Sequence, residues 1–225
     1  MAFSGLSIVF DLDGTFVDTA ADLADAMNAV LIEARRPPVP PAQVRHLVGR
    51  GARALIEAGF RANGDAPPPE DLERHVALFL DSYARNLMKH SRPYDGAVEV
   101  ATYLRGHGAR LGLCTNKPHK LTMALLAGLG ISPLFDAVLG ADAVVARKPD
   151  PRHLLDTIAR MEGDASRAVM VGDSEVDVAA ARGAKIPIVL VDHGYTSVPA
   201  RELGGDRVIG EFTELPAAIA TLMGK

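Results

Sequence analysis

The chain has 225 residues and is 48% hydrophobic, enough to bury the core of one large domain or of one domain with a small insertion. It carries 24 Lys and Arg against 28 Asp and Glu, a net charge of −4, and only 5% aromatic residues. This composition argues against nucleic acid as a partner, because basic surface and stacking rings are both scarce. The single cysteine cannot form an internal disulfide, and the N-terminal segment has no basic residue, which argues against a signal peptide. No apolar run of about 18 residues is present, so we expect no membrane span. These features favour a cytoplasmic protein.

Short apolar runs alternate with helical patterns over most of the chain. The runs are almost wholly apolar, as expected for parallel strands covered on both faces. The predicted strands are Leu6–Phe10, Arg110–Cys114, Ala137–Leu139, Ala168–Val171 and Ile188–Val191, with a last one near Arg207–Ile209. The predicted helices between and after them are Gly96–Gly106, Pro118–Gly130, Pro151–Met161, Ser174–Arg182 and Thr213–Met223. This alternation predicts an α/β fold with a doubly wound parallel sheet, a Rossmann-like core.

The segment after the first strand breaks this alternation. It shows only helical patterns, separated by the proline-rich stretches 37–41 and 67–69, where a helix cannot continue. The predicted helices are Thr19–Arg35, Ala42–Val48, Ala52–Phe60 and Glu70–Met88. We therefore expect an all-helical cap domain at 18–89, inserted into a core domain made of 1–17 and 90–225.

Polar side chains gather where the predicted strands end. In an open α/β sheet the ligand crevice lies beyond the carboxyl ends of the strands. The polar residues expected at that edge are Asp11, Asp13, Thr115, Asn116, Lys148, Asp173 and Asp177. Some of them fit local roles on their own, since Asp13-Gly14 is a common turn and Ser174-x-x-Asp177 matches a capping box. Their joint occurrence at successive strand ends predicts one site.

Four segments that carry these residues resemble, in order, the four motifs of the haloacid dehalogenase superfamily. They are DLDGTFVDT at 11–19, CTNKP at 114–118, RKPDP at 147–151 and GDSEVD at 172–177. The first departs from the usual pattern at Phe16 and Thr19, where leucine and serine are common. The helical insertion stands where the family has a cap, so the resemblance covers essentially the whole chain. Segments 36–38, 44–52 and 193–195 resemble more specifically the bacterial phosphoglycolate phosphatases.

The resemblance implies a phosphatase that acts on a small phosphorylated substrate such as 2-phosphoglycolate. On this view Asp11 attacks phosphorus and forms an aspartyl-phosphate, while Asp13 protonates the leaving alkoxide and then activates water. Lys148 neutralises charge, and Thr115 and Asn116 bind the phosphoryl oxygens together with it.

The same resemblance implies one Mg²⁺ as cofactor. Its ligands would be the carboxylates of Asp11 and Asp173 and a backbone carbonyl at Asp13, because Mg²⁺ prefers oxygen. Asp177 would orient the bound water or Lys148.

Substrate choice is expected to come from the cap. Arg50 could pair with a substrate carboxylate, and the flanking Gly49 and Gly51 would let the backbone approach a small ligand. The alternative is that Gly49 ends a helix and Arg50 is a solvated charge. For His46 two roles are open, a position facing the site or a structural role in the helix.

Other functions remain open at this stage. Asp13 argues against a dehalogenase, since halide leaves unprotonated, and the lack of lysine in residues 1–88 argues against a phosphonate hydrolase with a cap Schiff base. A sugar-phosphate mutase or phosphatase shares the core motifs. A non-catalytic phospho-accepting sensor is another class, although the chain is nearly twice the roughly 120 residues of such a small domain. A dinucleotide loop at 49–54 lacks the preceding strand. We expect a monomer or homodimer.

Overall fold

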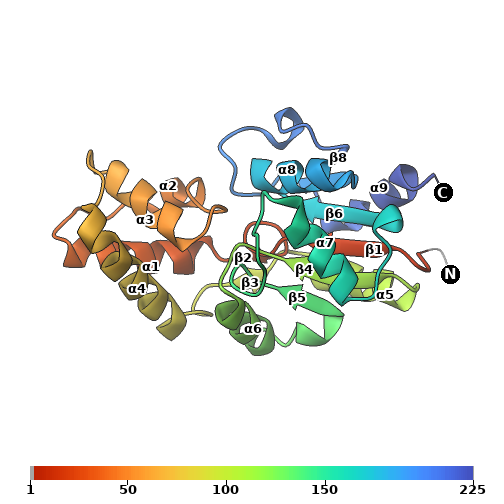
Figure 1. The fold of residues 1–225 in the computed structure, drawn as a ribbon, viewed down its shortest axis with the longest axis horizontal. Coiled ribbons are helices and arrows are strands. Elements are labelled where there is room, and N and C mark those ends of the chain that lie inside the picture. Colours follow the sequence, from red (N-terminus) through yellow and green to blue (C-terminus); the bar gives the residue numbers. More distant parts are fainter. Residues whose placement is uncertain (1–2, 225) are drawn as a thin grey trace.

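The computed structural model describes residues 3–224 and contains one parallel sheet of six strands, in the order β5-β4-β1-β6-β7-β8 (Figure 1). Its strands are β1 Ser7–Phe10, β4 Arg110–Cys114, β5 Ala137–Leu139, β6 Ala168–Gly172, β7 Ile188–Val191 and β8 Arg207–Ile209. All six predicted strands are confirmed, with ends moved by at most one residue. Met1, Ala2 and Lys225, which the expected core boundaries include, lie outside the described residues.

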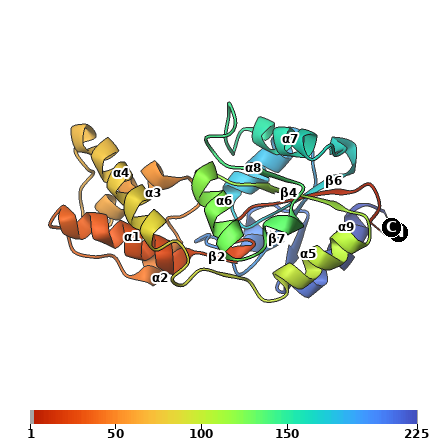
Figure 2. The same cartoon turned by 90° about the horizontal axis from the view of Figure 1, so that it is seen from below.

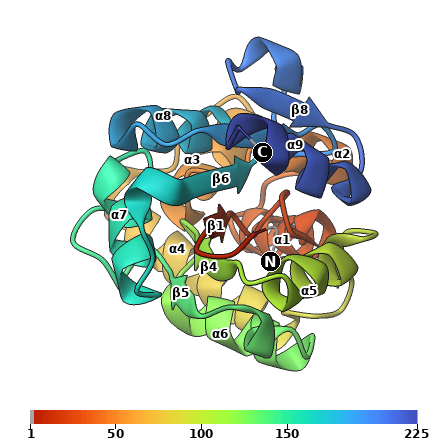
Figure 3. The same cartoon turned by 90° about the vertical axis from the view of Figure 1, so that its right-hand side faces the viewer.

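Helices cover both faces of this sheet, which confirms the doubly wound α/β class. They are α5 Ala97–Gly106, α6 His119–Gly128, α7 Pro151–Arg160, α8 Glu175–Ala184 and α9 Leu215–Leu222. Figure 3 shows α7 and α8 packed together on one face and α5 and α9 on the other. The central strand supplies both cores, because Ile8 and Phe10 point into one apolar cluster and Val9 into the other.

Four further helices lie together at one end of the molecule, beyond the sheet (Figures 1 and 2). They are α1 Ala20–Glu33, α2 Pro41–Arg45, α3 Ala52–Arg61 and α4 Pro69–Arg85, each overlapping a predicted helix. The chain enters and leaves this group through a short antiparallel pair, β2 Val17–Asp18 with β3 Arg92–Pro93. This pair was not predicted, because a strand of two residues has no alternation to detect.

Phe16 links the loop after β1 to the core of the sheet. Its ring centroid lies 5.3 Å from those of Phe10 and Phe135 and 5.9 Å from that of Phe212, in edge-to-face contacts. Such pairs add about 0.5–1.5 kcal/mol to the burial of the rings. Phe16, which stands where the family motif usually has leucine, is therefore part of an aromatic cluster in the core.

A buried carboxylate joins the two ends of the helical group. Asp22 of α1 is 1% exposed and accepts the backbone N–H groups of His90 and Ser91, both at 2.9 Å, and the Ser91 hydroxyl at 2.6 Å. This carboxylate therefore fixes the start of α1 against the segment that returns to the sheet.

We expect Asp22→Ala to lower the free energy of unfolding by about 2–4 kcal/mol, since it leaves buried N–H groups without an acceptor. Asp25→Ala is the matched control, because Asp25 lies on the same helix and pairs with Lys89 at 2.9 Å, but at an exposed position. Its cost should stay below about 1 kcal/mol. Urea unfolding of both variants measures the difference, and equal losses would show that Asp22 is not an anchor.

Candidate active site

A cavity of about 40 Å³ lies between the carboxyl ends of the strands and the helices α1, α3 and α4. This is room for a few water molecules. Its polar lining comes from the loops after β1 and β4, and its apolar lining comes mostly from the helices. The polar lining residues are Asp11, Asp13, Thr115, Asn116 and Lys117, together with Tyr83 of α4. The loops after β1 and β4 thus meet at this cavity, as predicted.

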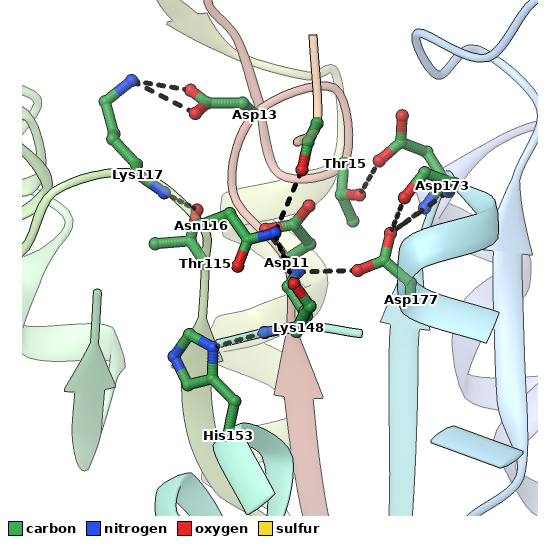
Figure 4. Close-up of polar contacts among 12 residues, drawn as sticks. Asp11, Asp13, Thr15, Thr115, Asn116, Lys117, Lys148, His153, Asp173 and Asp177 are labelled. Atoms are coloured by element: carbon green, nitrogen blue, oxygen red, sulfur yellow. Dashed lines mark hydrogen bonds and ion pairs between the residues drawn. The ribbon is translucent and has the colours of Figure 1, made fainter. Parts of the chain in front are cut away.

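Lys148 lies behind Asp11 at the floor of the site (Figure 4). Its Nζ is 2.9 Å from Asp11 Oδ1 and 2.6 Å from Asp177 Oδ1, and the side chain is 1% exposed. The contact with Asp11 is an ion pair without hydrogen-bond geometry, so Oδ1 of Asp11 accepts no hydrogen bond from residues 3–224. The backbone N–H of Lys148 donates to Nδ1 of His153 at 3.2 Å, which helps to fix the loop.

Asp173 follows β6 and lies beside the loop that follows β1. Its Oδ1 accepts the Thr15 hydroxyl at 2.7 Å, and its Oδ2 accepts the backbone N–H of Tyr195 at 2.8 Å. Gly14 between them has φ +84°, and a Cβ there would lie 2.7 Å from Asp173 Oδ2. Only glycine therefore fits this turn next to the carboxylate.

Asp177 has two roles in the structure. Its Oδ2 accepts the backbone N–H of Ser174 at 3.1 Å and the Ser174 hydroxyl at 2.7 Å, which confirms the predicted capping interaction at the start of α8. Its Oδ1 accepts a hydrogen bond from Lys148 at 2.6 Å. Both oxygens are thus bonded to the protein, which suits a residue that orients Lys148.

Three buried carboxylates, those of Asp11, Asp173 and Asp177, bring their oxygens within 4.8 Å of one another. Burial and the charge of Asp177 raise the pKa of Asp11 to about 7, although Lys148 opposes the shift. Burial and the other two carboxylates raise the pKa of Asp173 to about 8. Burial disfavours the charged form of Lys148, but the nearby acids raise its pKa nonetheless. One ammonium does not balance three acids, so the cluster fits a divalent cation held by oxygen ligands.

Thr115 and Asn116 directly follow the strand β4 and line the cavity. Thr115 Oγ1 accepts the backbone N–H of Lys117 at 3.2 Å, and it donates no hydrogen bond to a described residue. The side-chain amide of Asn116 donates to the carbonyls of Gly49 and Lys148, at 3.2 and 3.0 Å. The side-chain amide of Asn116 therefore connects the loop after β4 to the loops that contain Gly49 and Lys148. Its backbone N–H has no acceptor among residues 3–224 and is available to an anion.

Lys117 and Tyr83 are contacts of the site that the sequence analysis missed. Lys117 Nζ lies 2.9 and 3.2 Å from the two carboxylate oxygens of Asp13 and donates to Tyr83 Oη at 2.7 Å. Asp13 Oδ1 also accepts the Thr19 hydroxyl at 2.7 Å. Lys117 stands inside the second motif-like segment, which was the available signal, whereas nothing in the sequence pointed to Tyr83.

The residues predicted to lie in the cap near the substrate are found at different places in the structure. Gly49 and Gly51 line the cavity with Asp11 and Asp13. The side chain of Arg50, between these two glycines, forms an ion pair of 2.9 Å with Glu175 of α8 and is 68% exposed. His46 Nδ1 lies 3.2 Å from the carbonyl oxygen of Tyr195 and lines a different cavity.

Comparison with known proteins shows the family. Residues 8–191 match the model of the haloacid dehalogenase-like hydrolases. The chain belongs to this family. A relative named phosphoglycolate phosphatase in Caulobacter vibrioides is 48% identical over 98% of this chain and 93% of its own length. One of the same name in Mesorhizobium japonicum is 43% identical over 95% of this chain and 94% of its own length. A crystal structure described as a predicted phosphoglycolate phosphatase from Haemophilus somnus superposes with a TM-score of 0.88 at 27% identity, over 97% of this chain and 99% of that one.

The family match and these relatives confirm that the chain is an enzyme, a hydrolase of the phosphatase type. They also confirm the haloacid dehalogenase fold. Across residues 3–224, none of the helices is both long and apolar enough to cross a membrane.

A divalent cation should stabilise the wild-type protein, because it binds the folded acidic cluster and not the unfolded chain. We expect 5 mM MgCl₂ after treatment with a chelator to raise the melting temperature by about 2–8 °C for a chain of this length. Asp173→Asn removes one charge of the cluster and should abolish most of the shift, whereas Asp192→Asn, at another strand end, should keep it. An equal shift in both variants would place the cation elsewhere.

Proposed function

We propose that this enzyme hydrolyses 2-phosphoglycolate to glycolate and phosphate, through an aspartyl-phosphate on Asp11. The observation that carries the proposal is the position of Asp11, a buried carboxylate at the cavity wall whose Oδ1 lies 2.9 Å from the Lys148 ammonium. The relatives named phosphoglycolate phosphatase support this substrate. The apolar lining supports it too, since it offers few partners to the hydroxyl groups of a sugar phosphate.

In the first step an oxygen of Asp11 attacks phosphorus, and the bond between phosphorus and the ester oxygen breaks. The leaving alkoxide takes its proton from the carboxyl group of Asp13, which lines the same cavity. The products of this step are glycolate and a phosphoryl group on Asp11.

In the second step a water molecule attacks phosphorus, and Asp13, now ionised, accepts its proton. The bond between phosphorus and Asp11 breaks, which restores the carboxylate and releases inorganic phosphate.

The phosphoryl oxygens need donors in both steps. The Thr115 hydroxyl and the backbone N–H of Asn116 would supply them, since both residues line the cavity with Asp11, and the Lys148 ammonium, 2.9 Å from Asp11 Oδ1, would neutralise charge. Positioning of this kind supplies most of the catalysis in phosphoryl transfer. Asp177 fixes Lys148 by a hydrogen bond of 2.6 Å.

The cofactor that fits is Mg²⁺. The carboxylates of Asp11 and Asp173, with the backbone carbonyl of Asp13, would hold it, and when bound it lowers the repulsion between the phosphate and Asp11.

The helical group is proposed to act as a cap domain, residues 18–89, over a core domain of 1–17 and 90–225. The cavity lies between the strand ends and the helical group, so movement of the cap would open it for binding and for release. The small loops at Gly49 and Gly51 would approach the substrate. The single cysteine, Cys114, is buried and free, which suits a cytoplasmic enzyme. A monomer or homodimer, with no nucleic acid bound, stays a prediction.

Asp11→Asn should fold normally and lose about 10³-fold or more in kcat, because an amide is a poor nucleophile. Phosphate release from 2-phosphoglycolate with Mg²⁺ measures this, and circular dichroism checks the fold. Activity near that of the wild type would overturn the assignment of the nucleophile.

The substrate is tested by a panel of small phosphomonoesters, with Mg²⁺ and with a chelator. We expect the highest kcat/KM for 2-phosphoglycolate, many turnovers per enzyme, and loss of activity without the metal. A preference for sugar phosphates would contradict the substrate and leave the phosphatase class intact. Release of only one phosphate per chain would contradict catalysis by this site.

A further inference from the structure

Lys117 is a buried charge that the proposed chemistry does not use. Its side chain is 2% exposed and lines the cavity beside Asp13. Among the described residues that line this cavity, Lys117 carries the only positive charge, because Lys148 lies behind Asp11 and is not part of the lining. A cation that faces a substrate cavity is available to an anionic group of the substrate.

The contacts of Lys117 hold its ammonium in one place. Nζ lies within 3.2 Å of both oxygens of Asp13, donates to Tyr83 Oη at 2.7 Å and lies 4.3 Å from the centroid of the Tyr83 ring. Burial of the ammonium costs free energy, and its direct contacts with Asp13 and Tyr83 offset that cost. Tyr83 belongs to α4, so the helical group takes part in fixing this charge.

The rest of the lining is apolar on the side of the helical group. It is formed by Leu23, Val48, Ala52, Leu55, Phe79 and Leu80. A neutral polar group bound here would lose its water and gain few hydrogen bonds, which costs free energy. For an anionic group that reaches Lys117, attraction to the ammonium would offset the free energy lost with its water.

The position of Lys117 relative to Asp13 tells where that anion would be. Under the proposed function, on which this inference rests, Asp13 gives its proton to the leaving oxygen. Lys117 is in contact with Asp13 and hence close to this oxygen. In 2-phosphoglycolate the carboxylate is attached to the carbon that bears the leaving oxygen.

We infer that Lys117, positioned by Tyr83, binds the carboxylate of the substrate and selects phosphomonoesters that carry a negative charge next to the leaving oxygen. This role was one of the two expected of Arg50. The geometry favours Lys117, because Lys117 lines the cavity of Asp11 and Asp13, whereas Arg50 pairs with Glu175 at 2.9 Å and lines two neighbouring cavities, which Asp173 and Lys148 respectively also line.

The test compares two substrates of equal length in the Mg²⁺-loaded enzyme: 2-phosphoglycolate, and 2-hydroxyethyl phosphate, in which an uncharged hydroxymethyl group replaces the carboxylate. Lys117→Met should reduce the ratio of their kcat/KM values by about 10- to 100-fold, the range expected for a lost hydrogen bond to a charged group. The ratio separates substrate selection from any general effect through Asp13, since such an effect lowers both rates alike. Lys120→Met is the matched control, because it removes the same charge from an exposed position three residues along.

Tyr83→Phe provides a second, milder variant that keeps the lysine. It removes only the hydrogen bond to Nζ, and the ratio should fall by about 3- to 10-fold. A wild-type preference for 2-phosphoglycolate that survives unchanged in both variants would overturn the role of Lys117 and leave the proposed function standing. A wild-type enzyme without this preference would overturn the proposed substrate and the role of Lys117 together.

Discussion

The ion pairs of Lys148 are the interaction on which the rest of the site depends. Its buried ammonium lies between Asp11 and Asp177, at 2.9 and 2.6 Å, while Asp173 completes a cluster with more acid than base. Burying charged groups costs several kcal/mol each unless they are paired, so such a cluster is a poor way to stabilise a fold. It is a good way to bind a cation and a phosphate ester, which is what a phosphatase needs.

The fold brings these groups together by a simple geometric rule. All six strands run parallel, so the loops that follow β1, β4 and β6 meet at one edge of the sheet. The helical group then covers that edge. Asn116 bonds to Gly49 and Lys117 bonds to Tyr83, so the second of these loops contacts the helical group directly. The loop after β4 therefore links the carboxyl edge of the sheet directly to the helical group.

The strands could be predicted from the sequence, because fully buried parallel strands such as Ile188–Val191 appear in it as apolar runs. The sequence also predicted that Asp11 and Asp173 lie at the same edge of the sheet. It did not predict the contacts that depend on the direction in which a side chain points. For Arg50 two roles were expected, a contact with the substrate carboxylate or a solvated charge, and spacing alone did not choose between them. In the structure its exposed side chain pairs with Glu175, whereas Lys117, a neighbour of predicted residues, reaches Asp13 across the cavity. Such directions are decided by packing between distant segments, which spacing along the chain does not encode.

The central claim is that Asp11 carries the phosphoryl group during turnover. It is tested most directly by quenching the enzyme in acid while it hydrolyses a ³²P-labelled substrate, digesting it and locating the label. We expect the label in the peptide that contains Asp11, and we expect hydroxylamine to remove it. A label on a different residue, or none on that peptide when the burst of alcohol release shows that an intermediate accumulates, would contradict it.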